Sequence, residues 1–153
     1  MPLTYATAHE YLLQLGRRFA PIGRAQLSYD GLLVDAEYPL LVVEGDSQGS
    51  DVLREGSQPT GVESFTVAVQ VLTMPERADA TLLPAMLAET KGWAEALNEQ
   101  LRQEHAGCLL NVGWLALPGV AGTDLATGWR VELTLKLRKD IDRTVSAALF
   151  TPA

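Results

Sequence analysis

The feature that most constrains this fold is an almost unbroken alternation of polar and apolar residues from Arg130 to Arg138. Successive side chains of a β-strand point to opposite faces, so the alternation predicts a strand whose two faces differ chemically. The predicted apolar face consists of Val131, Leu133, Leu135 and Leu137. The predicted polar face consists of Arg130, Glu132, Thr134, Lys136 and Arg138. The pattern indicates a sheet with one packed face and one face that meets water or a polar partner.

Similar periodicities place the other elements. Residues 63–73 alternate as a strand, and an amphipathic helix follows, from a cap at Asp79 or Thr81 to about His105. Residues 109–117 form the next strand. Before these, a helix capped by Thr4 or Thr7 runs to about Phe19. Residues 26–34 and 38–44 then predict a hairpin of two strands with a short turn at 35–37.

These elements define an α+β fold in a single domain, residues 1–153. We expect a mixed or antiparallel sheet of about five strands, packed by an N-terminal helix and one long central helix. The run Leu40 to Val43 is continuously apolar, which predicts a strand covered on both faces. Residues 45–61 contain four glycines, three serines and a proline, and we interpret them as a mobile loop. The alternatives are a hairpin excursion that orders only on assembly and a tolerated insertion. Residues 140–153 form a C-terminal arm or a final strand.

Composition narrows the possible functions. The net charge of −7 argues against a surface that binds nucleic acid or anionic lipid, since both need clustered Lys and Arg. No apolar run approaches the roughly 18 residues that span a bilayer. The start of the chain lacks the segments of a secretory signal, which favours a cytoplasmic origin. The single cysteine, Cys108, is interpreted as a small buried hydrophobe rather than a nucleophile.

The chain shows no strong catalytic or cofactor motif. With His9, His105 and one cysteine, a zinc site is improbable, and no phosphate-binding glycine motif is present. Glu132 and Lys136 would lie about 13 Å apart on one strand face, too far to share a metal ion. We therefore expect no enzyme, no metal and no cofactor. An open alternative is a metal-dependent hydrolase that uses the acidic residues Asp30, Asp35, Glu37 and Glu44.

Two stretches carry a resemblance to a known family. They are Val67-Ala-Val-Gln-Val-Leu-Thr-Met-Pro-Glu-Arg77 and the Asp124-Leu-Ala-Thr-Gly-Trp129 lead into the last strand. Within residues 63–139 the chain resembles the tail terminator, or minor tail protein U-like, family of tailed bacteriophages. No catalytic residue is carried over from the family. The resemblance implies a structural protein that forms a ring, often a hexamer, which caps the tail tube and joins it to the head connector.

The implied partners are further copies of the chain, the tail-tube protein, and a head-connector or sheath protein, with no specific nucleic acid and no membrane. The implied location is the host cytoplasm during assembly, then the virion tail or an injection particle. Alternatives are a cap of a contractile injection system, a chaperone of unassembled tube subunits, and a small-ligand module that uses Trp93 or Trp114. We expect residues 46–61 and 140–153 to supply contacts. The candidate interface residues are Asp51, Leu53, Arg54, Trp93, Arg130, Glu132, Lys136, Arg138, Leu149 and Phe150.

Overall fold

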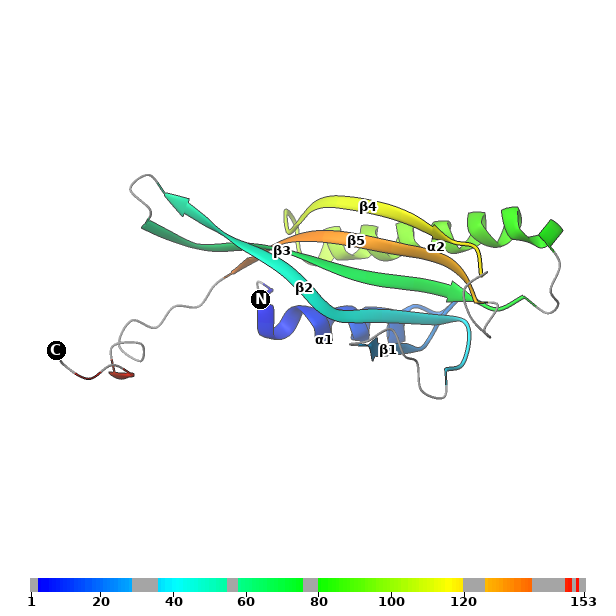
Figure 1. Ribbon diagram of the computed structural model, residues 1–153, viewed down its shortest axis with the longest axis horizontal. Coiled ribbons are helices and arrows are strands. Elements are labelled where there is room, and N and C mark those ends of the chain that lie inside the picture. Colours follow the sequence, from blue (N-terminus) through cyan, green and yellow to red (C-terminus); the bar gives the residue numbers. More distant parts are fainter. Residues whose placement is uncertain are drawn as a thin grey trace.

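In the described part of the chain, a mixed five-stranded sheet in the order β1-β2-β3-β5-β4 carries two helices packed against one of its faces (Figure 1). The structure, a computed structural model, describes residues 3–28, 36–54, 58–75, 80–119, 126–138, 148–149 and 151. The predicted α+β class is confirmed. The elements are α1 (Tyr5–Arg18), β1 (Ala25–Ser28), β2 (Leu40–Arg54), β3 (Gln58–Thr73), α2 (Leu83–Glu104), β4 (Leu109–Leu117) and β5 (Thr127–Arg138).

The helices begin and end where local chemistry directs them. Thr4 caps α1 through a reciprocal capping box with Thr7, as the sequence predicts. A short 3-10 turn (Ala80–Leu82) precedes α2, so α2 begins at Leu83 rather than directly after Thr81. Gly107 follows the end of α2 and has a φ of 80°. This left-handed conformation commonly ends a helix, and glycine adopts it most easily.

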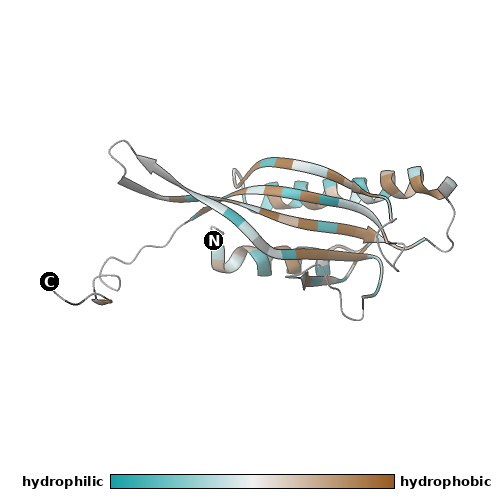
Figure 2. Cartoon of the chain, viewed as in Figure 1, coloured by the Kyte–Doolittle hydropathy of each residue, from teal (hydrophilic) through white to brown (hydrophobic). Residues whose placement is uncertain are grey.

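The main core lies between the two helices and the sheet. Its central members on β5 are Val131, Leu133, Leu135 and Leu137, all at most 2% exposed, which confirms the predicted apolar face. From α2 the core takes Ala94, Leu97 and Leu101. Figure 2 shows the resulting alternation of hydrophobic and hydrophilic residues along the strands. Leu40 to Val43 are all buried, so the prediction that this run is covered on both faces is confirmed.

The predicted hairpin of residues 26–34 and 38–44 is wrong. β1 pairs parallel to β2, with Ala25 opposite Leu41 and Ser28 opposite Glu44. A parallel pair requires the chain to return to the end from which it started, which a tight turn cannot do. The eleven residues between Ser28 and Leu40 supply that return. Residues 29–35, including most of the predicted turn, lie outside the described part of the chain.

The prediction of a loop at residues 45–61 is also wrong. Most of this segment continues β2 and begins β3, and the two strands pair antiparallel out to Arg54 and Gln58. One of the four glycines, Gly49, has a packing role. A Cβ at Gly49 would overlap the ring of Phe65 on the opposite strand, so glycine leaves room for that ring. Residues 55–57 lie outside the described residues.

β2 contains one irregularity near its middle. Between the pairs Val43–Val69 and Ser47–Val67, three residues of β2 face the single residue Ala68. Such a bulge bends a strand and increases its twist. Beyond it β3 still pairs with β5 as far as Val62, and Phe65 and Val67 still pack in the main core. We call the paired segments 47–54 and 58–67, which continue beyond the bulge, the ribbon.

Gly128 gives a direct test of this packing. A Cβ there would overlap the Val71 carbonyl oxygen of β3, because the two backbones run close together. We expect Gly128→Ala to lower the free energy of unfolding by about 3 kcal/mol, the upper end for overpacking a filled site. Urea unfolding followed by circular dichroism measures the change.

A glycine in open space provides the matched control. A Cβ at Gly92, on α2, meets nothing within 4 Å. Gly92→Ala should raise the free energy of unfolding by about 0.5–1 kcal/mol, because alanine loses less backbone entropy in a helix. Equal effects of the two substitutions would contradict the close approach of β5 to β3.

Candidate interaction surfaces

The sheet face without helices carries the polar half of the β5 alternation. Glu132, Lys136 and Arg138 are exposed, and Arg130 and Thr134 are partly buried. On the neighbouring strand, Thr66 lies 3.3 Å from Thr134, hydroxyl to hydroxyl. We call this the open face. The four predicted interface residues of β5 therefore lie together on one surface.

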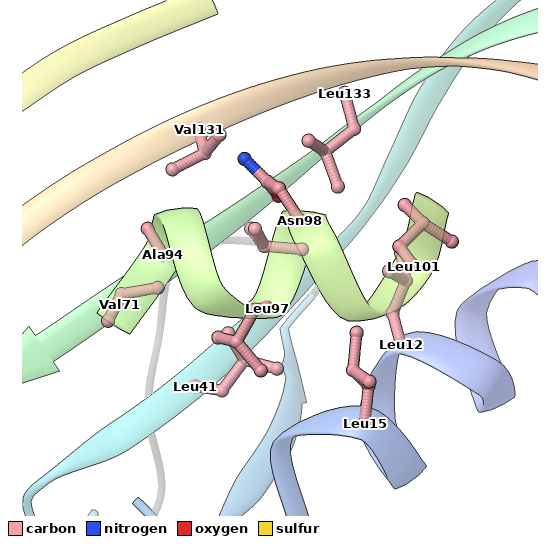
Figure 3. A pocket seen from close by; sticks show the side chains of 11 residues that line it. Leu12, Leu15, Leu41, Val71, Ala94, Leu97, Asn98, Leu101, Val131 and Leu133 are labelled. Atoms are coloured by element: carbon pink, nitrogen blue, oxygen red, sulfur yellow. The ribbon is translucent and has the colours of Figure 1, made fainter. Parts of the chain in front are cut away.

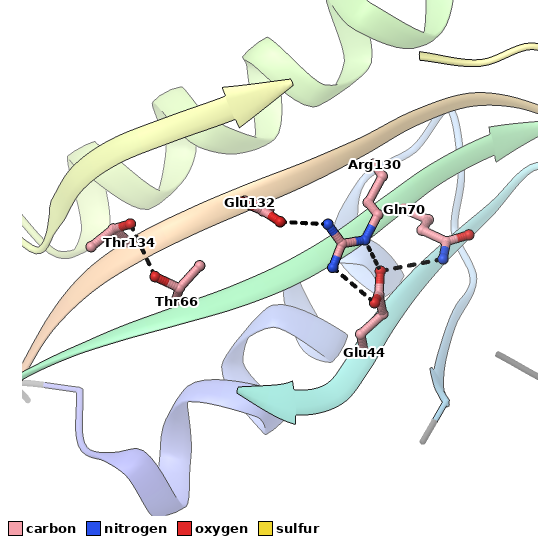
Figure 4. Close-up of polar contacts among 6 residues, drawn as sticks. All are labelled: Glu44, Thr66, Gln70, Arg130, Glu132 and Thr134. Carbon is pink, nitrogen blue, oxygen red and sulfur yellow. Dashed lines mark hydrogen bonds and ion pairs between the residues drawn. The ribbon is translucent and has the colours of Figure 1, made fainter. Parts of the chain in front are cut away.

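Arg130 is the hub of an ion-pair cluster on the open face (Figure 4). Its Nε and Nη2 donate to the Glu44 carboxylate at 2.8 and 3.2 Å, and its Nη1 donates to Glu132 at 2.6 Å. Gln70 also donates to Glu44, at 3.3 Å. The hydrogen bond to Glu44 is the main cause that raises the pKa of Arg130. Because Glu44 lies at the bulge, this cluster fastens the bend of β2 to β5.

The opposite end of the open face is apolar. Leu40, Val42 and Leu72 are buried there, with Tyr38 and Leu117 packed against them. The sheet therefore has a small second core on the face that the β5 pattern alone describes as polar. The described charged side chains on the rest of this face are Glu44 and Glu132 against Arg130, Lys136 and Arg138. The net charge of −7 is therefore not concentrated on this face.

The ribbon extends past the rest of the fold. β5 pairs with β3 only as far as Val62, whereas β2 and β3 continue to pair beyond it. Figure 1 shows the ribbon reaching past the ends of both helices and of β4. The predicted contact residues Asp51, Leu53 and Arg54 lie on its β2 strand. A two-stranded ribbon without a core of its own is marginally stable in water, which favours a partner surface.

A second surface is the outer edge of β4, the last strand of the sheet. Nothing in the described part of the chain pairs with this edge. Leu110 and Leu115 are 55% and 56% exposed on it. The sequence did not identify these residues as interface candidates. Leu109–Leu117 contains no charged residue, and the sequence shows this. The absence of charge points to an interface only once β4 is known to be an edge strand.

The three tryptophans have different environments. Trp93 packs partly buried against the main core, so this predicted interface residue is largely a packing residue. Trp129 donates its indole N–H to the Leu87 carbonyl of α2 at 2.8 Å. Trp114 lies edge-to-face on Trp129, with the Lys91 ammonium 5.2 Å from its ring centroid. Trp114 remains 37% exposed beside the β4 edge.

The space between α2 and the sheet does not form a ligand pocket. Its cavity is about 10 Å³, room for about one water molecule, and it is lined by core residues and Asn98 (Figure 3). Neither Trp93 nor Trp114 lines it. The small-ligand interpretation based on these tryptophans therefore has no preformed cavity between α2 and the sheet.

The acidic residues considered for a metal site are dispersed where the structure describes them. Glu44 pairs with Arg130, and Glu37 pairs with Arg24 at 3.2 Å. Asp30 and Asp35 lie outside the described residues. Within the described ranges, no three His, Cys, Asp or Glu side chains come together in a way that suits a metal ion.

A polar junction joins the two helices. Glu104 at the end of α2 accepts two hydrogen bonds from Arg18 of α1, at 2.8 and 2.9 Å, and one from the Tyr11 hydroxyl at 2.7 Å. The hydrogen bond from Arg18 is the main cause that lowers the pKa of Glu104 to about 2. Burial, and then the bond to Glu104, raise the pKa of Tyr11. The junction fixes the spacing of α1 and α2 above the sheet.

An open groove of about 470 Å³ adjoins this junction and includes His105 and Cys108. Burial raises the pKa of the Cys108 thiol and lowers the pKa of His105. Both shifts favour the neutral forms, whereas a catalytic cysteine is activated as a thiolate beside a cationic partner. Cys108 is 8% exposed, which is consistent with the small buried hydrophobe that the sequence predicts.

Little of the C-terminal arm is described. Ala148 is helical, and Leu149 lies in a turn and is 79% exposed. Phe150 and residues 139–147 lie outside the described residues.

No helix in the described ranges is long and apolar enough to cross a membrane. Comparison with families of known proteins gives no match to this chain, and no curated protein matches it.

The Glu104 junction predicts a pH dependence of stability. Because the folded-state pKa lies below the ordinary value of 4.5, the junction stabilises the protein above about pH 4.5. That contribution is lost as the pH falls toward 2. Glu104→Gln should lower the melting temperature at pH 7 and flatten its fall between pH 5 and pH 2. Thermal scans across this range measure both effects.

Glu99→Gln is the control, because it removes the same charge from an exposed position on the same helix. It should keep the pH slope of the wild type. If Glu104→Gln and the wild type lost melting temperature in parallel, the role given to Glu104 would be incorrect.

Proposed function

We propose that this protein is a structural assembly protein that forms a closed ring of identical subunits and caps a tubular assembly. In this role it resembles the tail terminators of tailed bacteriophages. Its partners are then other copies of itself, the tube subunit, and a connector or sheath protein. It acts in the host cytoplasm during assembly and afterwards in the finished particle. The proposal assigns it no cofactor, metal or catalytic step.

The observation that carries the proposal is the ribbon. A long β-hairpin that projects beyond its own core gains little from the protomer it belongs to. The polar cluster at the bulge nevertheless anchors its base, because Glu44 of β2 accepts two hydrogen bonds from Arg130 and one from Gln70. A projection that is anchored at its base and unsupported beyond it suits contact with a neighbouring subunit.

The position of the ribbon also favours a ring over a two-fold dimer. The ribbon projects from the β2–β3 side of the sheet, and the uncovered apolar edge is β4, at the other side. Two different patches make heterologous contacts, which generate a ring when the rotation closes. The open face, with charges of both signs, is then available to line a wet central channel.

Shortening the ribbon tests the proposal. Residues 52–62 are replaced by Asn-Gly, which suits a two-residue hairpin turn between the paired residues Asp51 and Glu63. None of the removed residues belongs to either described core cluster, so the melting temperature should change little. The wild type should form a discrete ring by light scattering and negative-stain microscopy, and the shortened variant should remain smaller at the same concentrations.

The contrary results are equally clear. A wild-type protein that stays monomeric over the whole concentration series, and also in the presence of tube ends, would rule out the ring. A shortened variant that forms the same ring as the wild type would leave the ring in place and remove the ribbon from its contacts.

A further inference from the structure

The β4 strand lacks the protection that soluble proteins usually give to an exposed sheet edge. Edge strands are normally short, charged, interrupted by proline or covered, because their free N–H and C=O groups recruit other strands. β1, the other edge, follows this rule with four residues. β4 has nine residues, Leu109–Leu117, and no Asp, Glu, Lys or Arg. Its outer edge is therefore built to be covered.

The exposed apolar side chains lie on the same strand. The described residues include six large exposed hydrophobics, and Leu110, Trp114 and Leu115 of β4 are half of them. Leu115 lies opposite Arg130 and so faces the open face, whereas Trp114 lies opposite Val131 on the helix face. The edge thus has apolar groups above and below its free backbone, as a strand-accepting site requires.

We propose that residues 144–151 of a second copy of this chain add to the outer edge of β4 as an extra strand. This inference rests on the proposed ring, for which it names one of the two contacts. Residues 144–150 read Thr-Val-Ser-Ala-Ala-Leu-Phe and carry no charge, like β4 itself. Pro152 follows, and proline ends strand pairing because it lacks an N–H donor.

The chain before this segment has the composition and length of a linker. Residues 139–143 read Lys-Asp-Ile-Asp-Arg, so four of the five are charged and suited to water. β5 ends at Arg138, and the six steps from there to Thr144 span up to about 20 Å when extended.

The occupant comes from another copy rather than from the same protomer. Leu149 is 79% exposed, so its own β4 does not bury it. In the same protomer Leu110 and Leu115 also remain exposed. The β4 edge and Leu149 are therefore both exposed in one copy, and both become covered when the segment of one copy binds the edge of another. The edge and the segment are different patches, so the contact is heterologous, as a ring requires.

A labelled peptide tests the contact directly. The probe is a fluorescent peptide of residues 139–153, and the receptor is the protein lacking residues 144–153, whose edge cannot be filled by other copies. Fluorescence anisotropy should show saturable binding. Leu110→Lys with Leu115→Lys should weaken the binding by roughly tenfold or more, since the buried area of two leucines is lost. Ala96→Lys, on the exposed side of α2, should leave the binding unchanged.

Absence of binding, equal binding of a scrambled peptide, or equal binding by the double variant would overturn the inference. Mixing two full-length forms gives a second test that needs no peptide. The arm-deleted chain and the double lysine variant should each be unable to self-associate through this contact. Mixed together, they should form a 1:1 pair by native mass spectrometry, because one supplies the edge and the other the segment.

The outcomes separate this contact from the ring itself. If the arm-deleted chain still forms the wild-type ring, the ring stands and the β4 contact is wrong. If the 1:1 pair forms but the wild type builds no ring, the contact stands and the proposed function is wrong. If the mixture stays monomeric while the arm protects β4 from hydrogen exchange within one chain, the segment binds its own edge and the inference is wrong.

Discussion

The uninterrupted pairing of β3 with β5 is the constraint on which the rest of the structure depends. Residues Val62 to Thr73 face Arg138 to Thr127 one to one, without a register shift. A slip of one residue would turn Leu133 and Leu135 from the core to the open face. The register therefore fixes which side α1 and α2 cover, and it places Arg130 opposite Gln70, within reach of Glu44 at the bulge.

The Arg130 cluster connects this frame to the projecting ribbon. Within it the Arg130–Glu44 pair is only partly exposed, 30% for Arg130 and 22% for Glu44, so this pair is shielded from water more than a typical surface pair. Because the Arg130 guanidinium on β5 holds the Glu44 carboxylate at the bulge, it limits the bending of β2 at that point. The ribbon thus has a rigid base even though its outer half lacks a core. Such an element can present the same surface to a neighbour in each copy.

Residues whose partners are close in sequence were predicted well, and residues whose partners are distant were not. The β5 alternation, the Thr4 cap and the stop after α2 follow from local periodicity, and the structure confirms them. Gly49 was misread because its reason is the ring of Phe65, sixteen residues away on another strand. The parallel pairing of β1 was missed for the same reason. The β4 residues Leu110 and Leu115 look like ordinary strand residues until the sheet order makes β4 an edge.

The ribbon and the exposed β4 edge together have a consequence for assembly. The ribbon and the β4 edge lie on different sides of the sheet. In the proposed β4 contact one protomer supplies residues 144–151 and its neighbour supplies the β4 edge, so a pair of subunits joined in this way leaves one segment and one edge free. In the proposed ring, growth stops only when the last subunit meets the first. A closed ring covers every apolar edge, whereas an open chain of any length leaves one Leu110–Trp114–Leu115 surface in water. Hydrophobic burial therefore favours closure over continued linear growth.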